Sequence, residues 1–278
     1  DVLVIGAGPA GYVCAIRAAQ LGHKLGCIKA STYEGGMGGT CLNWGCIPAK
    51  ARLESASLAQ NLKAHGEEMG VRAENEVYDK SAAVDRSRFI SEKLTGGIRF
   101  LFKKNKVEVF EGRGRITGPG TVEVTPDEGD PYVVEAANIV VATGAVMMSF
   151  PGFEIDGDKV IGSREALALR NLPERMVVVG GGYVGVEFAD VFNAFGVDVT
   201  VVEMLDTLVP ISDPEVGKTL ARSFKKRGMT IKTGTKVVSL DREASPMVLT
   251  VESKKGQETI ETDILLMAVG RKPVTEGL

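Results

Sequence analysis

The chain repeats one pattern at long range, and this repeat constrains its fold more than any other feature. Residues 2–22 and 177–196 each contain a short β-branched run, a G-x-G-x-x-G turn, an amphipathic helical pattern and a final glycine. A shift of 174 residues superposes the glycines of the two copies: Gly6, Gly8, Gly11 and Gly22 fall on Gly180, Gly182, Gly185 and Gly196. A strand before this turn and a helix after it are typical of dinucleotide binding. The sequence therefore predicts an α/β fold with two Rossmann-like dinucleotide-binding domains, each built on a parallel sheet.

The three glycines of each turn have separate physical roles. The first allows the tight passage from strand to helix, the second lets a pyrophosphate approach the backbone, and the third permits close packing of helix on strand. The phosphates then lie at a helix N-terminus, where free N–H groups and the helix dipole favour negative charge. A glycine-rich turn without a ligand is the alternative, and two copies in full strand–helix context argue against it.

A carboxylate is expected at the end of the second strand of each copy, where it binds the adenosine ribose. In the second copy this residue is Glu203, 23 residues after Gly180. It accepts hydrogen bonds from ribose hydroxyls and repels a 2′-phosphate, so the second site is predicted to bind NAD. In the first copy the same register falls on Lys29, a donor where an acceptor is expected. Glu34, in the following glycine-rich stretch, is an alternative acceptor.

Cys41 and Cys46 are the residues that indicate a chemical reaction. Two cysteines with four residues between them are also compatible with half of a zinc site. The chain has only two histidines, however, and its other cysteines, Cys14 and Cys27, lie in the predicted first helix and second strand. A four-ligand site has no obvious donors, and we predict no bound metal.

The alternative of two buried structural thiols is also disfavoured. Pro48 favours the first turn of a helix, so Cys46 is expected at a helix N-terminus, where the dipole favours the thiolate and makes it available for exchange. Lys50, four residues after Cys46, lies on the same helical face and adds a positive charge.

The run G-G-T-C-L-N-W-G-C-I-P-A-K at 38–50 resembles the redox-active disulfide signature of the flavoprotein disulfide reductases, most closely its dihydrolipoamide dehydrogenase branch. The resemblance extends to further segments of the chain: 94–98, 141–144, 180–187 and 268–273. It implies an FAD- and NAD-dependent oxidoreductase that oxidises dihydrolipoamide, the lipoyl group of a 2-oxoacid dehydrogenase complex, through a Cys41–Cys46 disulfide. Electrons pass from the dithiol to this disulfide, then to the flavin and the nicotinamide.

The resemblance also assigns site residues by matching motif. Cys46 would lie against the flavin, Cys41 would exchange with dihydrolipoamide, and Lys50 would pair with Glu187 near the contact of flavin and nicotinamide. The residues expected at FAD are Gly6, Gly8, Gly11, Lys29, Gly39, Thr40, Lys50, Gly114, Thr143 and Gly144. The residues expected at NAD are Gly180, Gly182, Gly185, Glu187, Glu203, Val237 and Gly270.

The domain organisation follows from the same comparison. Residues 1–148 are expected to form the first part of an FAD-binding domain, 149–270 an NAD-binding domain, and 271–278 the start of the return to the FAD domain. In the family the sequence continues with a second FAD motif and a dimerisation domain that carries a catalytic histidine–glutamate pair. A homodimer is therefore expected, and a chain that begins at Asp1 rather than Met is expected to be processed or partial.

Two other functions remain open from the sequence. A glutathione- or mercuric-type reductase shares the chemistry, but such enzymes usually prefer NADP, which Glu203 disfavours. A non-catalytic nucleotide-binding fragment, without the C-terminal acid/base and dimer domain, is the alternative from another class.

Composition excludes several partners and addresses location. The net charge is −3, so no basic surface indicates nucleic acid, and no apolar run approaches the ~20 residues that span a bilayer. Asp1 leads directly into a strand-like run, so no signal peptide is expected. Four cysteines are too few for a secreted disulfide scaffold. We therefore expect a reducing compartment, the cytoplasm or the mitochondrial matrix.

Overall fold

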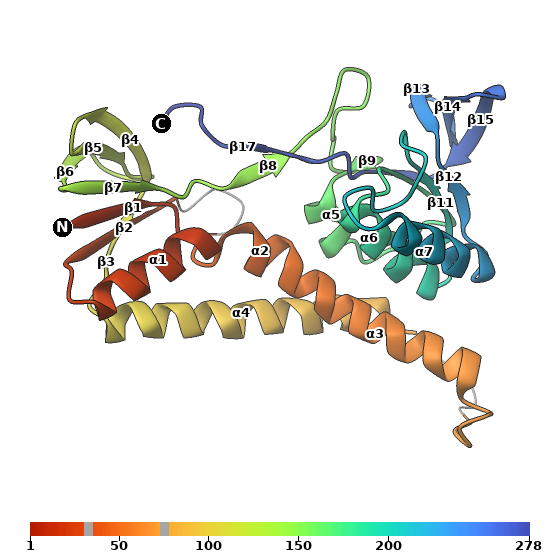
Figure 1. Ribbon diagram of the computed structural model, residues 1–278, viewed down its shortest axis with the longest axis horizontal. Coiled ribbons are helices and arrows are strands. Elements are labelled where there is room, and N and C mark those ends of the chain that lie inside the picture. Colours follow the sequence, from red (N-terminus) through yellow and green to blue (C-terminus); the bar gives the residue numbers. More distant parts are fainter. Residues whose placement is uncertain (31–35, 73–77) are drawn as a thin grey trace. The chain divides into compact units, whose positions relative to one another are not determined.

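The computed structural model describes residues 1–30, 36–72 and 78–278. These residues form two compact units, one made of Asp1–Pro48, Ser87–Val146 and Lys272–Leu278, the other of Ala49–Arg86 and Met147–Arg271. Helices and strands are labelled as in Figure 1. Among the described residues, no helix has both the length and the apolar character needed to cross a membrane.

The first unit is built on a parallel sheet whose strands follow the order β3-β2-β1-β7. Its strands are β1 (Val2–Ile5), β2 (Leu25–Lys29), β3 (Glu108–Glu111) and β7 (Asn138–Val141). A separate antiparallel sheet contains β4 (Arg113–Gly118), β5 (Thr121–Thr125) and β6 (Tyr132–Glu135). The helices are α1 (Pro9–Gln20), α2 (Gly39–Trp44), α3 (Cys46–His65, which continues into the second unit) and α4 (Lys80–Lys104, which begins in the second unit).

The second unit is built on a parallel sheet of order β12-β11-β10-β16-β9. Its strands are β9 (Val160–Ile161), β10 (Arg175–Val179), β11 (Asp198–Val202), β12 (Thr230–Lys232) and β16 (Ile264–Met267). An antiparallel sheet contains β13 (Thr235–Asp241), β14 (Met247–Ser253) and β15 (Gly256–Thr262). The helices of this unit are α5 (Ser163–Ala168), α6 (Tyr183–Ala194) and α7 (Pro214–Lys226). Two further strands, β8 (Ala145–Met147) and β17 (Arg271–Pro273), pair with each other where the chain passes from one unit to the other.

The repeat seen in the sequence extends to the topology of both units. In each, the strand before the glycine turn (β1 or β10) is central, and the next two strands of the parallel sheet lie successively to one side of it. A three-stranded antiparallel sheet precedes the strand that pairs on the other side, and the second unit has β9 as an additional edge strand. The α/β fold with two Rossmann-like parallel sheets is therefore confirmed. Two copies of one pattern have produced two copies of one architecture.

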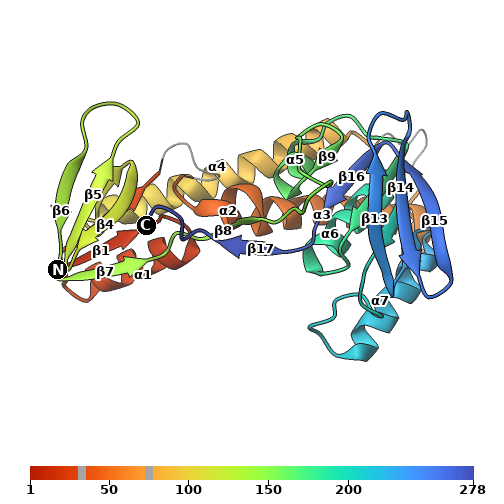
Figure 2. The same cartoon turned by 90° about the horizontal axis from the view of Figure 1, so that it is seen from above.

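Alternation along each central strand explains the layers. In β1, Val4 faces a core that includes Ala15 of α1 and Phe102 of α4, whereas Leu3 and Ile5 face β5 of the antiparallel sheet. Successive strand residues point to opposite faces, so one short apolar strand supplies both cores. The second unit follows the same rule: Met176 and Val178 of β10 belong to the core of α6, whereas Val177 and Val179 belong to the core of β14. Figures 1 and 2 show this unit, and in Figure 1 the strands β11 and β12 of the same sheet lie between the helices α6 and α7 and the antiparallel strands β13, β14 and β15.

Two cations are buried beside one aromatic ring in the second unit. The Arg52 side chain is 0% exposed, donates from Nη1 to the Ala166 carbonyl at 2.7 Å, and lies 5.5 Å from the centre of the Phe192 ring. The Lys80 side chain is 4% exposed, with Nζ 4.5 Å from the same ring centre. Burial, and to a lesser degree the charge of Arg52, lowers the pKa of Lys80 to about 7. The lysine is thus close to losing its charge at neutral pH.

This burial predicts a pH-dependent stability. An unfolded chain keeps Lys80 protonated up to its ordinary pKa of about 10.4, so between about pH 7 and 10 the unfolded state binds more protons. The free energy of unfolding is therefore expected to rise across that interval, by on the order of 3 to 5 kcal/mol from this residue. Urea denaturation at several pH values should show that Lys80→Met removes this rise. The matched control is Lys93→Met, which removes an exposed lysine of α4; equal pH profiles for the two variants would contradict the prediction.

Candidate functional site

The first glycine turn has the close contacts that its sequence predicts. Gly6 follows β1 with φ +111°, and a Cβ there would lie 2.2 Å from the carbonyl oxygen of Ala142. A Cβ at Gly11 would lie 1.8 Å from the carbonyl oxygen of Gly6. Gly8 is the N-cap residue of α1. The turn is therefore as tight as its backbone permits, and it presents the free N–H groups of α1 at the end of β1.

The cysteine segment begins directly against this turn. A Cβ at Gly39 would lie 2.5 Å from the Cα atom of Gly8, so the two backbones are in contact. Gly39 opens α2, which carries Thr40 and Cys41 in its first turn, and Cys46 is the first residue of α3. Cys46 is exposed and Cys41 is half-buried. The short helix α2 and the first residue of α3 thus carry the two thiols of the segment that begins against the first glycine turn.

The two other cysteines differ from this pair. Cys27 in β2 is 0% exposed, and burial, with a smaller contribution from Cys14, raises its pKa to about 12. A thiol with so high a pKa forms little thiolate and is a poor nucleophile. Cys14 is half-buried within α1. Burial therefore separates the inert Cys27 from the accessible Cys46.

Gly114, Thr143 and Gly144, which are also expected at FAD, lie in the same unit. Gly114 in β4 leaves no room for a side chain, because a Cβ would lie 2.9 Å from Cδ1 of Ile28. Thr143 and Gly144 follow β7, and both are hydrogen-bonded to Val274 near the end of the chain. The Thr143 hydroxyl donates to the Val274 carbonyl at 2.6 Å, and the Val274 N–H donates to the Gly144 carbonyl at 3.0 Å. The segment after β17 thus lies beside the end of β7.

Lys29 is paired with a carboxylate that the sequence does not indicate. It is the last residue of β2, and its Nζ lies 3.1 Å from Oε1 of Glu111 at the facing position of β3. The Lys29 side chain is 16% exposed and that of Glu111 is 65% exposed. An acidic group therefore does lie at this edge of the sheet, on the neighbouring strand. Glu34, the acceptor considered from the sequence, lies outside the described residues.

Because Lys29 pairs with Glu111, a single substitution is not enough to place the expected ribose-binding carboxylate at the end of β2. Lys29→Glu alone would place two carboxylates on facing strand positions, which is destabilising. The double variant Lys29→Glu/Glu111→Lys keeps the ion pair and puts the acceptor on β2. It is expected to bind FAD about tenfold more tightly, the gain of one hydrogen bond to a charged group. Titration followed by flavin fluorescence measures this, with Glu111→Lys as the control; equal affinity of the double variant and the unmodified chain would contradict it.

The second glycine turn repeats the geometry of the first. Gly180 has φ +109°, and its Cβ would lie 2.4 Å from the carbonyl oxygen of Ala268. A Cβ at Gly185 would lie 1.9 Å from the carbonyl oxygen of Gly180, whereas no heavy atom lies within 4 Å of a Cβ at Gly182. Packing therefore requires a glycine at positions 180 and 185, whereas Gly182, the N-cap residue of α6, faces open space.

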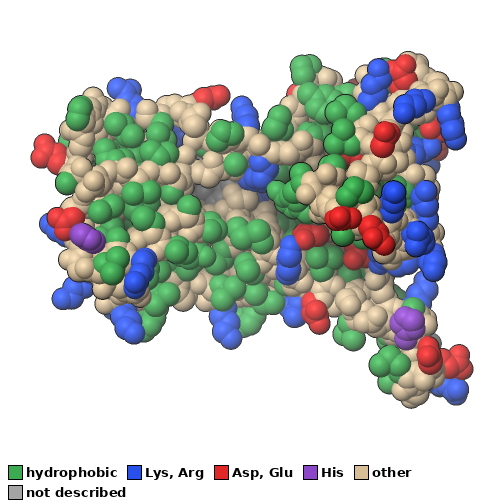
Figure 3. Space-filling model, in the orientation of Figure 1, with side chains coloured by type: hydrophobic (Ala, Val, Ile, Leu, Met, Phe, Trp, Pro, Cys, Tyr) green, Lys and Arg blue, Asp and Glu red, His purple; other side chains and the backbone are tan. Residues whose placement is uncertain are grey.

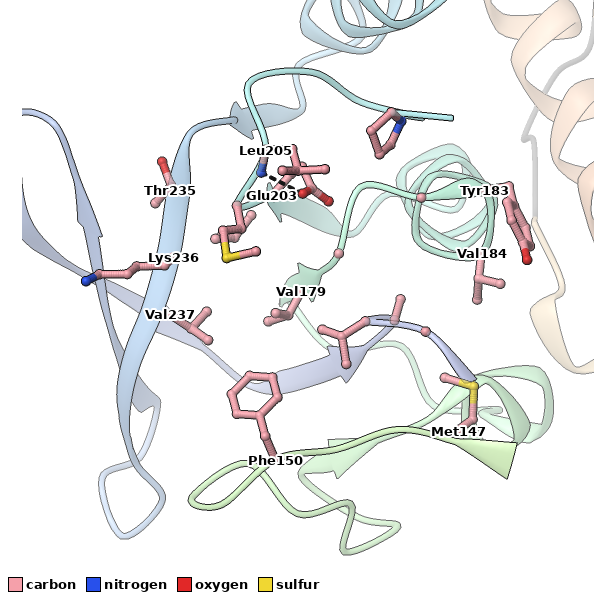
Figure 4. A pocket seen from close by; sticks show the side chains of 18 of the residues that line it. Met147, Phe150, Val179, Tyr183, Val184, Glu203, Leu205, Thr235, Lys236 and Val237 are labelled. Carbon is pink, nitrogen blue, oxygen red and sulfur yellow. Dashed lines mark hydrogen bonds between the residues drawn. The ribbon is translucent and has the colours of Figure 1, made fainter. Parts of the chain in front are cut away.

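A pocket of about 600 Å³ opens beside this turn (Figure 4). Its lining includes five residues that the sequence predicted for NAD: Gly180, Gly182, Glu203, Val237 and Gly270. This volume lies within the ordinary range of small-molecule sites. The two other residues predicted for NAD, Gly185 and Glu187, lie on α6, where Gly185 is buried against the turn.

Glu203 is held in place by backbone donors. It follows β11 and is 9% exposed, with Oε2 accepting from the Gly181 N–H at 2.6 Å and Oε1 from the Leu205 N–H at 2.7 Å. Figure 4 shows its bond to Leu205 at the pocket wall. A carboxylate has about four lone-pair sites, so both oxygens retain capacity for further donors. The residue is a fixed acceptor, as recognition of two neighbouring hydroxyls requires.

Lys50 and Glu187 lie together in the second unit. The Lys50 Nζ and Glu187 Oε1 form an ion pair between α3 and α6. The Lys50 side chain is 61% exposed and that of Glu187 is 24% exposed. Lys50 lies one helical turn after Cys46 along α3, so a single helix carries the accessible thiol and the paired cation.

Several lining residues carry no recognisable signal in the sequence. Met147 is the last residue of β8, Phe150 follows this strand, and Tyr183 occupies a variable position of the glycine motif. Lys236 and Arg271 add positive charge to the lining. Of these residues, Arg271 is the one that the sequence could have indicated, because it directly follows Gly270 in the segment 268–273.

The two sites fit the two dinucleotides expected from the sequence. At the first, the N-cap residue Gly8 has no side chain to cap the first N–H groups of α1, where a pyrophosphate is favourably bound. At the second, the open space at Gly182 and the fixed acceptor Glu203 provide for a pyrophosphate and a ribose.

Comparisons with known proteins agree with this geometry. The chain matches the family described as "Pyridine nucleotide-disulphide oxidoreductase" over residues 1–278. It is 43% identical over 280 residues to the mitochondrial dihydrolipoyl dehydrogenase of Pisum sativum, covering 100% of this chain and 55% of that protein. It is also 43% identical to the dihydrolipoyl dehydrogenase of Chlorobaculum parvum, covering 58% of it. The chain thus spans a little over half the length of these relatives.

Solved structures agree with both the fold and the family. LpdA from Mycobacterium tuberculosis superposes with a TM-score of 0.87 at 28% identity, covering 100% of this chain and 60% of that one. The HOCl-induced flavoprotein disulfide reductase RclA from Escherichia coli gives a TM-score of 0.80 at 26% identity, with 58% of that chain covered. The cofactors of such proteins are FAD and NAD(H), as the resemblance of the sequence implied. The chain belongs to the pyridine nucleotide-disulphide oxidoreductase family.

Proposed function

We propose that the chain forms the FAD- and NAD-binding part of a dithiol–disulfide oxidoreductase that oxidises dihydrolipoamide. One observation carries the proposal: the backbone of Gly39, which opens the cysteine segment, lies against Gly8 of the first dinucleotide turn. A redox-active thiol pair placed at a flavin site is the arrangement that this chemistry requires. The resemblance of segment 38–50 to the dihydrolipoamide dehydrogenase branch supports the substrate.

The proposed reaction begins at Cys41. A thiolate of the substrate attacks its sulfur, the Cys41–Cys46 bond breaks, and Cys46 leaves as a thiolate. The second substrate thiol then attacks the mixed disulfide, which forms the cyclic disulfide product and leaves Cys41 as a thiol. Two electrons have then moved from substrate to protein; one substrate proton ends on Cys41, and the other was released when the attacking thiolate formed, so Cys46 remains a thiolate. When bound, FAD and NAD supply the onward transfer of the two electrons as a hydride.

The other residues of the site bind and orient. We propose that Gly6, Gly8 and Gly11 bring the FAD pyrophosphate to α1, and that Gly180, Gly182 and Gly185 do the same for NAD at α6. Further FAD contacts are assigned to residues near the ends of strands and at the start of the cysteine segment: Lys29, Gly39, Thr40, Gly114, Thr143 and Gly144. Glu203 binds the NAD ribose and favours NAD over NADP, while Val237 and Gly270 line the same pocket. The Lys50–Glu187 ion pair joins α3 to α6. We propose that this pair acts where the flavin passes its hydride to the nicotinamide.

The domain assignment belongs to this proposal. Residues 1–148 form the first part of the FAD-binding domain, 149–270 the NAD-binding domain, and 271–278 the start of the return. The hydrogen bonds of Val274 with Thr143 and Gly144 support the return of the chain to the first unit.

We further propose that the protein acts on the lipoyl group of a 2-oxoacid dehydrogenase complex, as a homodimer, in the cytoplasm or the mitochondrial matrix. Relatives of mitochondrial and bacterial origin support the location. Exposed apolar side chains on α1 and α4 support an assembly larger than this chain, and Figure 3 shows such side chains spread over that surface. Three of them are more than half exposed, Val13, Phe89 and Phe100, and so is Leu21 at the C-cap of α1.

Disulfide mapping tests the redox assignment. Mild oxidation followed by alkylation of free thiols and peptide analysis should find Cys41 linked to Cys46, with Cys14 and Cys27 alkylated after unfolding. Cys27 is the internal control, because its thiol is buried and has a raised pKa. A disulfide between any other pair, or none after oxidation, would count against the proposed reaction.

A further inference from the structure

Asn43 lies between the two cysteines of the motif and is hydrogen-bonded at both ends of its amide. Its Nδ2 donates to the carbonyl oxygens of Met37 at 3.0 Å and Gly39 at 3.2 Å. Its Oδ1 accepts from the hydroxyl of Thr95 at 3.1 Å. One side chain therefore links the glycine turn before Cys41 to helix α4.

The glycine turn depends on such a link. Gly38 and Gly39 have φ of +100° and +61°, so the chain enters α2 through two residues in left-handed backbone conformations. Glycine reaches these conformations without strain but is not confined to them. Because Asn43 binds the carbonyls of Met37 and Gly39, it restrains the turn from the far side of Cys41.

Thr95 anchors this restraint in the core of the first unit. It lies on α4, is 8% exposed, and donates to Asn43 from the interior. Beside it, Leu42 of α2 packs in one apolar core with Ile98 and Phe102 of α4. The helix α4 thus holds α2 by an apolar contact at Leu42 and a polar one at Asn43.

We propose that Thr95, acting through Asn43, is a positioning residue that sets the dithiol–disulfide equilibrium of Cys41 and Cys46. The proposal rests on the redox role of the two cysteines proposed above. A disulfide demands a narrow range of Cα separations and a χ₃ dihedral near ±90°, whereas two thiols make no such demand. A restraint on the segment raises the effective concentration of one thiol at the other and so favours the disulfide.

Loss of the Thr95 hydroxyl therefore has a predicted direction. Thr95→Val keeps the shape of the side chain but removes this donor from the half-buried side chain of Asn43. We expect the equilibrium constant for forming the Cys41–Cys46 disulfide to fall about tenfold, which corresponds to about 30 mV for a two-electron couple. The reduction potential of the pair becomes more oxidising, because the dithiol is favoured.

Equilibration with glutathione measures this constant. The protein dithiol and glutathione disulfide exchange to give the protein disulfide and two glutathione thiols, so every bond and electron is accounted for. The chain is incubated at a series of glutathione ratios and quenched by alkylation, and the Cys41–Cys46 disulfide is quantified by peptide mapping. Thr95→Ala, which cannot overpack the site, repeats the test with a smaller side chain.

Two variants separate positioning from a general effect on the helix. Thr95→Ser retains the hydroxyl and should restore the unmodified equilibrium. Ser91 lies one turn earlier on α4, is 2% exposed, and donates to the carbonyl of Ser87 in its own helix at 3.1 Å. Ser91→Ala therefore removes a buried hydroxyl from the same helix without touching Asn43, and it should leave the equilibrium unchanged.

The outcomes are distinct. An unchanged equilibrium in Thr95→Val and Thr95→Ala, or an equal shift in Ser91→Ala, would overturn the positioning role. Absence of a Cys41–Cys46 disulfide in the unmodified chain at every glutathione ratio would instead overturn the proposed redox function.

Discussion

Gly185→Ala should destabilise the second unit by at least about 3 kcal/mol, beyond the usual cost of overpacking, because its new Cβ meets backbone. The atom would lie 1.9 Å from the carbonyl oxygen of Gly180. That carbonyl cannot retreat freely, since Gly180 is itself packed against the Ala268 carbonyl, 2.4 Å from the position of a Cβ. Urea denaturation followed by circular dichroism should show the loss as a transition at lower denaturant or as an unfolded unit.

Gly182→Ala is the matched control within the same motif. No heavy atom lies within 4 Å of a Cβ at Gly182, so the fold should be retained. The methyl group would instead occupy the space at the N-terminus of α6 where the NAD pyrophosphate is proposed to bind, and affinity for NADH should fall. One glycine is thus expected to affect stability and the other binding. Equal stability of the two variants, or unchanged NADH affinity in Gly182→Ala, would contradict this division.

Glu203→Ala should weaken NADH binding by about tenfold to a hundredfold, the cost of losing hydrogen bonds to a charged acceptor. Its carboxylate is held by the N–H groups of Gly181 and Leu205 and needs no rearrangement to bind a ribose. The same variant should narrow the preference for NADH over NADPH, because removal of the negative charge ends the repulsion of the 2′-phosphate.

Parallel titrations with NADH and NADPH measure both effects. Glu258→Ala is the control, since it removes a carboxylate from the same unit that pairs instead with Lys232 on β12. It should leave the ratio of affinities unchanged. Equal affinity of the unmodified chain for the two nucleotides, or an unchanged ratio in Glu203→Ala, would contradict the role of Glu203.

The parts of the structure that the sequence predicted are those encoded by short, local patterns. The strands β1 and β10, the helices α1 and α6 and the turns between them follow from β-branched runs and glycine spacing. The close contacts at Gly11 and Gly185 are the physical reason for that spacing. The position of Glu203 after β11 follows from the same repeat.

The features that the sequence did not predict depend on residues far apart in the chain. Lys29 and Glu111 pair across two strands 82 residues apart, and no local pattern identifies the partner. Arg52 looks like a surface residue of an amphipathic helix, yet it is fully buried because the Ala166 carbonyl accepts its hydrogen bond. Phe150 lines the pocket from the segment between β8 and β9, where no local sequence pattern indicates a pocket residue.

Reduction of the Cys41–Cys46 disulfide by dihydrolipoamide is the step on which the proposed function depends most. The most direct measurement is anaerobic addition of one equivalent of dihydrolipoamide to the oxidised, FAD-loaded protein, with thiols counted by alkylation and NADH followed after NAD⁺ is added. We expect the unmodified protein to gain two thiols, at Cys41 and Cys46, before NAD⁺ is added and to lose them again as NADH forms, whereas Cys46→Ser forms no NADH. NADH formation by Cys46→Ser at the unmodified rate, or an intact Cys41–Cys46 disulfide after dihydrolipoamide, would contradict it.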